Sequence, residues 1–191
     1  MVAKMPWGEV RTPLCTLRDF RDTDAPALAG YRSDPEVALF QGWTPPFTEE
    51  RALALIHSVR SLPFGTADSW FQVALADPLE DHLLGDIGLH FLADGFQVEI
   101  GFTLARANWG KGIAAAGLRA LLDKVFVYLG KHRAIAVIDA RNTAAEKLLT
   151  GVRFRQEAHF VQGAFFKGQW VDEKVFACLS HEWQIEREAA G

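Results

Sequence analysis

Hydrophobic and polar positions along the chain follow two periods, one typical of strands and one typical of helices. Runs of alternating or continuous apolar residues predict strands, bounded by turn residues such as Gly, Pro and Asp. The predicted strands cover residues 11–18, 69–76, 83–92, 97–104 and 133–139, with two more at about 154–162 and 170–180. Helical segments lie between them, so the pattern indicates a mixed α/β chain.

The longest helical pattern runs from Gly112 to Tyr128. Apolar residues recur there at helical spacing, namely at Ile113, Leu118, Leu121, Leu122, Val125 and Phe126. Shorter helices are predicted from Asp22 or Thr23 as N-cap to about Tyr31, from Thr48 to about Arg60, from Thr143 to Thr150, and in a polar tail at the C-terminus. No internal repeat or linker interrupts this order, so we expect residues 1–191 to form a single domain.

Composition narrows the class of protein. The net charge is −4 without a block of Lys or Arg, which argues against a nucleic-acid partner. No apolar run is long enough to cross a membrane, and residues 1–11 lack a signal-peptide core, so we expect a cytoplasmic protein without a membrane partner. Cys15 and Cys178 lie in apolar segments typical of buried, reduced thiols. The six histidines show no metal-ligand spacing, so no metal is expected.

The segment Asn108–Ala114 is the strongest candidate for ligand binding. Its two glycines, Gly110 and Gly112, stand between a predicted strand and the longest helix. Glycine lets backbone N–H groups approach a ligand, and a helix N-terminus adds unpaired donors and a positive dipole end. The combination suits a pyrophosphate, although a tight turn without a ligand explains two glycines equally well. The spacing fits neither a dinucleotide fold nor a Walker motif.

Four motifs, in the same order along the chain as in a known family, carry a resemblance to it. The first two are Leu17-Arg18 with Asp24, and Glu-Ile-Gly-Phe-Thr-Leu at 99–104 followed by Trp-Gly-Lys-Gly-Ile-Ala at 109–114. The other two are Asp-Ala-Arg-Asn-Thr-Ala at 139–144, and Lys-Gly-Gln-Trp-Val-Asp-Glu at 167–173 continuing to 181–183. Together they resemble the GNAT superfamily of N-acetyltransferases, and more narrowly its RimJ/RimL branch, whose founding members acetylate ribosomal-protein N-termini. The resemblance spans about 11–183, with short tails outside.

This resemblance implies an α+β fold with a mixed, mostly antiparallel central sheet flanked by helices. Two parallel central strands, 97–104 and 133–139, would splay apart to admit the pantetheine arm of acetyl-CoA. Backbone groups of Phe102 and Leu104 would bind the pantetheine amides, and Asn142 would bind the arm from the far side. The pyrophosphate would lie on the turn formed by Trp109, Gly110, Lys111, Gly112, Ile113, Ala114 and Ala115.

Three positions depart from the family pattern. Trp109 replaces the Gln or Arg of the wider superfamily, Ala145 replaces a frequent Ser, and Arg153 stands where the motif has Gly before Phe154. In relatives, a Ser or Tyr often protonates the departing thiolate. The chain has only Tyr31 and Tyr128, neither at the expected place, so the general acid stays open and water can serve.

Catalysis requires a base for the attacking amine. Glu99 is the first candidate because its strand faces the acceptor side, and the alternative is a solvent-facing or ion-paired carboxylate. His90 is the second candidate, with a core histidine as its alternative. Asp86 could orient an amine or face a turn. The resemblance implies that Trp43, Phe47, Trp70 and Phe71 fall at the acceptor cleft, although most aromatic residues belong to the core. The Pro45-Pro46-Phe47 loop is the better candidate for the acceptor wall, because loops often carry specificity.

These observations predict transfer of an acetyl group from acetyl-CoA to a primary amine, with a protein N-terminus as the leading acceptor. Two alternatives stay open. The same fold could acetylate a small-molecule amine such as an antibiotic or a polyamine, or the chain could be a silent acyl-CoA-binding module. The oligomeric state also stays open, with a homodimer as one option.

Overall fold

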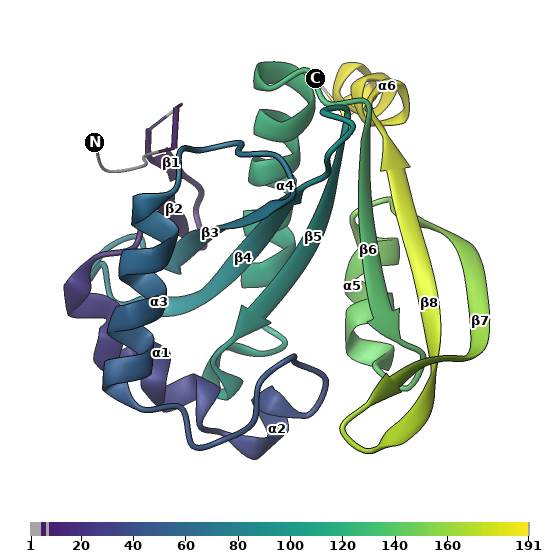
Figure 1. Ribbon diagram of the computed structural model, residues 1–191. Coiled ribbons are helices and arrows are strands. Elements are labelled where there is room, and N and C mark those ends of the chain that lie inside the picture. The colour runs from purple at the N-terminus through teal and green to yellow at the C-terminus, as the bar shows by residue number, and fades with distance from the viewer. Residues whose placement is uncertain (1–4, 7, 191) are drawn as a thin grey trace.

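An eight-stranded sheet runs through the protein, whose computed structural model describes residues 5–6 and 8–190 (Figure 1). Its strands are β1 (Val10–Arg11), β2 (Thr16–Arg18), β3 (Ser69–Ala76), β4 (Leu83–Phe91), β5 (Gln97–Leu104), β6 (Arg133–Asp139), β7 (Arg155–Phe166) and β8 (Gln169–Leu179). They follow the order β1-β2-β3-β4-β5-β6-β8-β7. Within the part of the chain that the structure describes, β5 and β6 are the only strands that pair in parallel. The expected mixed, mostly antiparallel sheet is confirmed.

The two central strands diverge after a short parallel contact. Gln97, Val98 and Glu99 pair with Arg133, Ala134 and Ile135, and beyond these residues β5 and β6 share no ladder. Figure 1 shows the two strands spreading apart toward their C-terminal ends. The expected splay is therefore present, and it exposes backbone groups along one edge of β5.

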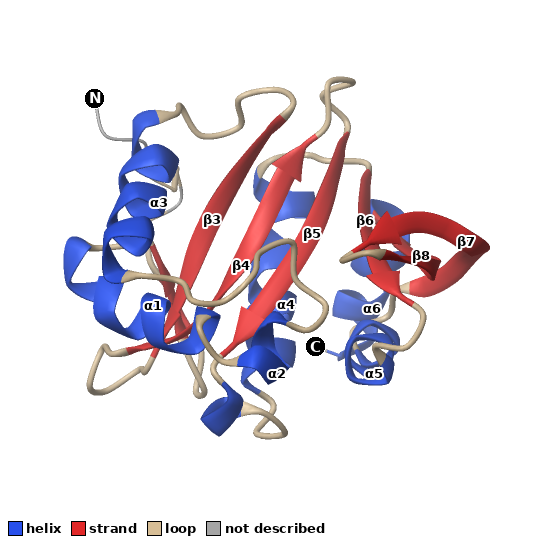
Figure 2. Cartoon of the chain, turned by 60° about the horizontal axis from the view of Figure 1, so that its bottom comes forward, coloured by secondary structure: helices blue, strands red, loops and turns tan. Residues whose placement is uncertain are grey.

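Helices cover the two faces of the sheet unequally (Figure 2). They are α1 (Ala25–Arg32), α2 (Pro35–Ala38), α3 (Glu49–Ser61), α4 (Ile113–Asp123), α5 (Thr143–Gly151) and α6 (Ser180–Ala190), with 3-10 turns at Asp22–Asp24 and Arg106–Asn108 and a π-helical turn at Lys124–Tyr128. The larger core packs α4 and α5 against one face, and a smaller core packs α1 and α3 against β3 and β4 on the other. Among the described residues, no helix is long and apolar enough to cross a membrane.

Several elements begin and end where the hydrophobic pattern predicts. The strands at 69–76, 97–104 and 133–139 are confirmed to the residue. Thr48 is the N-cap of α3, and its hydroxyl accepts a hydrogen bond from the backbone N–H of Arg51 at 3.2 Å. The predicted helix from Gly112 to Tyr128 is present as α4 and the π-helical turn that continues it.

Two predictions near the N-terminus are wrong. A single strand over 11–18 is instead a tight hairpin of β1 and β2, because the Thr12 hydroxyl accepts hydrogen bonds from the N–H groups of Leu14 and Cys15 and turns the chain. The N-cap of α1 is Asp24 rather than Asp22 or Thr23, which lie in a 3-10 turn. The short helix α2 has no counterpart among the predicted elements, and part of the expected N-terminal tail lies outside the described residues.

A buried salt bridge with Arg18 holds Asp24 at the start of α1. The Arg18 side chain is 2% exposed, and its two terminal nitrogens each donate to Asp24 at 2.8 Å. Its Nε donates to Asp81 at 2.7 Å. Burial of a guanidinium is tolerated only when its donors are paired in this way. The cluster fixes the start of α1 against β2, and thereby the position of α2 beside the central gap.

Candidate functional site

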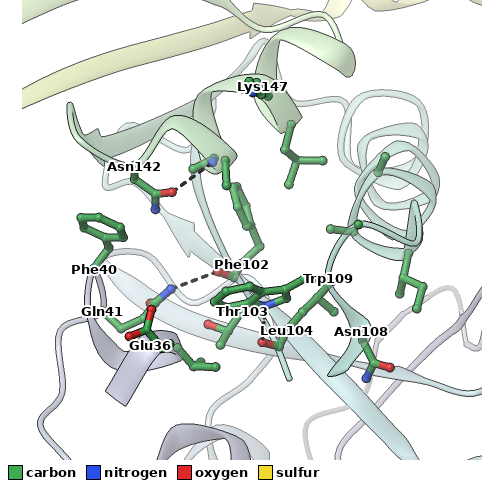
Figure 3. A pocket seen from close by; sticks show the side chains of 18 of the residues that line it. Glu36, Phe40, Gln41, Phe102, Thr103, Leu104, Asn108, Trp109, Asn142 and Lys147 are labelled. Atoms are coloured by element: carbon green, nitrogen blue, oxygen red, sulfur yellow. Dashed lines mark hydrogen bonds between the residues drawn. The ribbon is translucent and has the colours of Figure 1, made fainter. Parts of the chain in front are cut away.

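The gap between β5 and β6 opens into a cavity of about 520 Å³. One wall is β5 with the Trp109–Ala115 turn, the opposite wall is the start of α5, and the residues after α1 close the mouth (Figure 3). The lining includes Glu36, Phe40, Gln41, Phe102, Thr103, Leu104, Asn108, Trp109, Gly110, Gly112, Ile113, Ala114, Ala115, Asn142, Ala145 and Lys147.

Backbone groups of Phe102 and Leu104 face this gap, as expected. The Gln41 side-chain amide donates to the Phe102 carbonyl at 3.2 Å, and the Trp109 indole N–H donates to the Leu104 carbonyl at 3.0 Å. The β5–β6 ladder ends at Glu99, so beyond Glu99 this edge of β5 pairs with no strand among the described residues. An edge strand with free N–H and C=O groups can bind the amides of an extended ligand.

The glycine turn has the geometry of an anion site. Gly110 and Gly112 adopt φ of 72° and 78°, a region that side chains rarely enter, and Gly112 is the N-cap of α4. No side chain among the described residues caps α4, so the first N–H groups of the helix are available to a ligand. Lys111 is exposed and does not line the cavity, in contrast to the other residues predicted for the turn.

Asn142 is placed on the far wall by two local interactions. Its backbone N–H donates to the Asp139 carbonyl at 2.9 Å, and its side-chain oxygen accepts from the Ala145 N–H at 3.1 Å as the N-cap of α5. Because the oxygen is used in the cap, the amide N–H₂ group is the part available to a ligand. Figure 3 shows Asn142 across the gap from Phe102.

Glu99 and His90 do not line the cavity, and they lie near the point where β5 and β6 diverge. The two residues are register partners on β5 and β4, and His90 Nδ1 lies 3.4 Å from Glu99 Oε2. His90 Nε2 lies 3.3 Å from Asp68, and the imidazole stacks on Trp70 with ring centroids 5.0 Å apart. The β5–β6 ladder ends at Glu99, so this pair sits where the gap begins.

Trp43 and Phe47 pack into the smaller core instead of lining the cavity. The Trp43 indole donates to the Arg32 carbonyl at 3.0 Å, and the Arg32 guanidinium lies 4.1 Å from the centroid of the Trp43 ring. Phe47 is 7% exposed. Their placement in the structure matches the core alternative, and their role in acceptor binding stays a prediction.

Asp86 is buried in β4 rather than facing a turn. It accepts hydrogen bonds from the Tyr31 hydroxyl and from Arg32, the latter at 3.3 Å. Burial, together with the Asp86 charge, raises the pKa of Tyr31 well above its usual value. The Tyr31 proton is therefore held in a structural hydrogen bond and is poorly placed to act as a general acid.

Glu36, Phe40 and Gln41 line the cavity and were not among the predicted site residues. Gln41 reaches Phe102 across 61 sequence positions. No local motif marks these residues, because the fold brings them to the gap through the packing of α1 and α2.

Comparison with known proteins gives a consistent result. Residues 15–155 match the sequence profile described as an acetyltransferase (GNAT) domain. The chain is 30% identical to the uncharacterised N-acetyltransferase p20 of Bacillus licheniformis, over 90% of this chain and 96% of p20.

Two solved structures show the same fold. One is RimL, a ribosomal L7/L12 alpha-N-protein acetyltransferase in complex with coenzyme A, with a TM-score of 0.78, 17% identity and coverage of 90% of this chain and 97% of RimL. The other is the spermidine N-acetyltransferase of Vibrio cholerae in complex with CoA and spermine, with a TM-score of 0.75, 19% identity and coverage of 91% and 99%.

Proposed function

Because this chain belongs to the GNAT family and is an N-acetyltransferase that uses acetyl-CoA, we propose that it moves the acetyl group to a primary amine by direct attack within a ternary complex. The observation that carries the proposal is the splayed gap, which joins an unpaired strand edge to an uncapped helix N-terminus. The two features lie along one cavity. An acetyl donor with an extended pantetheine arm and an anionic pyrophosphate requires this arrangement.

The residues present fit acetyl-CoA. Phe102 and Leu104 would pair with the pantetheine amides once Gln41 and Trp109 release their carbonyls. The N–H groups at the start of α4 would bind the pyrophosphate, and the Asn142 amide would donate from the far wall. When bound, the cofactor supplies an activated thioester, and the protein's part is to position the reactants and move protons.

Glu99 is proposed as the general base that deprotonates the amine, with His90 as its proton-relay partner. An amine reaches the site largely as an ammonium ion and must lose a proton before it attacks. The Glu99 carboxylate lies at the closed end of the gap, and His90 can pass a proton on toward Asp68 and solvent. A backbone N–H on the free edge of β5 would stabilise the developing oxyanion. With Ala145 in place of Ser and Tyr31 engaged by Asp86, water would protonate the leaving thiolate.

The two solved structures of the same fold suggest two classes of acceptor amine. RimL is described as acting on a ribosomal protein and the Vibrio cholerae enzyme as acting on spermidine. Both a protein N-terminal amine and a small-molecule amine are therefore proposed acceptors, since one fold supports both.

Thiol release from acetyl-CoA tests the proposal across a panel of N-terminal peptides, monoamines, diamines and aminoglycosides. We expect release that depends on at least one amine and a product heavier by one acetyl group. Binding of acetyl-CoA with no amine-dependent release across the whole panel would instead support a silent acyl-CoA-binding module.

A further inference from the structure

We propose that the acceptor carries two cationic groups joined by a flexible apolar chain, and that Glu173 binds the group that does not react. This inference rests on the proposed function and deepens it. It concerns the face of β5, β6 and β8 that is turned away from α4 and α5, here called the open face. Its residues include Glu99 on β5, with Ile135, Val137 and Asp139 on β6, Glu173, Val175 and Ala177 on β8, and Phe160 on the neighbouring strand β7.

Strand alternation places these side chains on one face. Ala134, Ala136 and Phe176 belong to the core under α4 and α5, so their neighbours Ile135, Val137 and Val175 point the opposite way. Glu99 is in register with Ile135, and Glu173 with Asp139. Figure 1 shows α5 behind β6 and no helix in front of β6 and β8.

The first end of the open face is the Glu99–His90 pair. Trp70 stands beside it with its six-membered ring on Gly88, where a Cβ would lie 2.9 Å from the indole. One face of the indole stacks on His90, and the side chain is 42% exposed. A carboxylate next to an exposed aromatic ring suits an ammonium group on a methylene chain. The reacting amine would lie here, at the closed end of the gap.

The second end repeats this chemistry on the far side of the gap. Glu173 is half-buried, and no hydrogen bond or ion pair involves its carboxylate among the described residues. Its register partner on β7 is Phe160, whose ring is 53% exposed. Both side chains lie close to Gly163, where an added Cβ would be 2.7 Å from Phe160 Cβ and 3.5 Å from Glu173 Oε2. An exposed aromatic residue is thus again the cross-strand neighbour of a carboxylate.

The floor between the two ends is apolar. Ile135, Val137 and Val175 lie between Glu99 and Glu173, and Val137 is 38% exposed. Glu173 lies two strands from Glu99 and four positions further along β6, which corresponds to about 10 Å across the sheet and about 13 Å along it. A methylene chain with a cation at each end matches an apolar floor bounded by two carboxylates.

Three arginines near this face are paired with carboxylates other than Glu173. Arg133 and Arg155 bind Glu157, and Arg141 binds Asp139. They do not neutralise Glu173, and the partners of Glu99 and Asp68 are the two nitrogens of one histidine. The open face therefore carries a negative charge at Glu173 that these arginines do not neutralise. This charge attracts a cationic acceptor and disfavours an anionic one.

The experiment compares octamethylenediamine with octylamine, which differ by one amino group. We expect the parent protein to acetylate the diamine with a kcat/KM about tenfold higher, mainly through a lower KM. Glu173→Gln keeps the size of the side chain and removes its charge, and it should abolish this preference while leaving octylamine unchanged. Glu157→Gln is the matched control, since it removes a charge from a paired carboxylate and should preserve the preference.

Two results would overturn the inference. One is an equal kcat/KM for the two amines in the parent, and the other is a diamine preference that survives in Glu173→Gln. If peptides are acetylated and neither alkylamine is, the inference fails while the proposed function stands. If acetyl-CoA binds and no amine of any class is acetylated, the proposed function fails with it.

Discussion

The two glycines of the turn differ in how closely the rest of the chain approaches them. A Cβ at Gly110 would meet nothing within 4 Å, whereas a Cβ at Gly112 would lie 3.4 Å from the Leu14 side chain. Both residues have a positive φ, so any side chain there strains the backbone, and a β-branched one does so most. Gly112 also sets the direction of the first N–H groups of α4. It is therefore the residue where a single substitution should separate folding from cofactor binding.

Gly112→Val should weaken binding of acetyl-CoA at least about a hundredfold, because several charge-assisted hydrogen bonds of about 1.5–3 kcal/mol each depend on this turn. The helix behind it is amphipathic and should survive. Calorimetry with acetyl-CoA and circular dichroism on the same sample check both statements. Lys111→Ala serves as the control and should lose little, since an exposed lysine contributes screened charge. Parent-like affinity in Gly112→Val would reduce the turn to a structural connection.

Glu99→Gln should lower kcat by about a hundredfold or more while affinity for acetyl-CoA stays unchanged, because the amide cannot accept the proton of the amine. His90→Gln should have a smaller effect if His90 relays that proton. The pH–rate profile of each variant is the measurement. A profile in Glu99→Gln that matches the parent would remove Glu99 from the mechanism and leave His90 or water as the base.

At this scale the sequence is informative where a function depends on neighbouring residues. Gly110, Gly112 and Asn142 stand in local motifs, and the structure places all three on the cavity. Arg153 shows the same local logic, since its φ of 71° explains why the family pattern has glycine there. Gln41 and Glu173 carry no such motif. Their positions depend on packing between distant segments, which no local pattern encodes.

Among the elements, the connection from β6 to α5 is the one that positions a cofactor ligand. Asp139 is 6% exposed and accepts hydrogen bonds from the backbone N–H and from Nε of Arg141, both at 2.9 Å. The hydrogen bond from the Arg141 side chain lowers the pKa of Asp139 below its usual value. This interaction closes the turn that presents Asn142 to the gap.

Asp139→Asn should therefore destabilise the protein by about 1 kcal/mol at neutral pH and weaken acetyl-CoA binding a few-fold. A carboxylate whose pKa is lowered by folding contributes stability above its unfolded pKa of about 4, and that contribution is lost as the pH falls through the folded pKa. The difference between parent and variant should accordingly shrink in acid. Urea unfolding of both proteins at neutral pH and near pH 3 measures it, and a difference that is constant with pH would contradict this role.

Element boundaries were predictable where hydrophobic period and capping agreed. The strand 97–104 alternates cleanly, and Thr48 caps α3 as its position suggests. Prediction failed where a side chain overrides the period, as Thr12 does by turning the chain inside the expected first strand. It also failed for β7, which continues to Phe166 past an irregularity between Phe160 and Ala164. An irregularity of this kind depends on its partner strand and cannot be seen in one segment.

At the scale of the whole molecule, the sheet consists of two parts joined at a narrow place. The strands β1 to β5 and the strands β6 to β8 share only the short parallel ladder from Gln97 to Glu99. The Lys167 ammonium group adds a link across the mouth, donating to the Ala38 carbonyl at 2.6 Å, and burial lowers the pKa of Lys167. A ligand that fills the gap would contact both parts, so binding should be coupled to the stability of the whole fold.

Acetyl-CoA should therefore raise the melting temperature, and a chelator should not change this effect because the predicted site uses no metal. Ligand at about a hundred times its Kd adds about 2.7 kcal/mol of stability, which corresponds to a rise of roughly 5–10 °C for a chain of this size. Hydrogen exchange should locate the effect, with slower exchange at the N–H groups of Phe102, Leu104 and the first turn of α4, since these are the donors that the ligand would engage. Gly112→Val should lose both signals at the same ligand concentration. If millimolar acetyl-CoA shifts neither the melting temperature nor the exchange of these amides, the gap is not the donor site, and the residues assigned to it must be sought elsewhere on the chain.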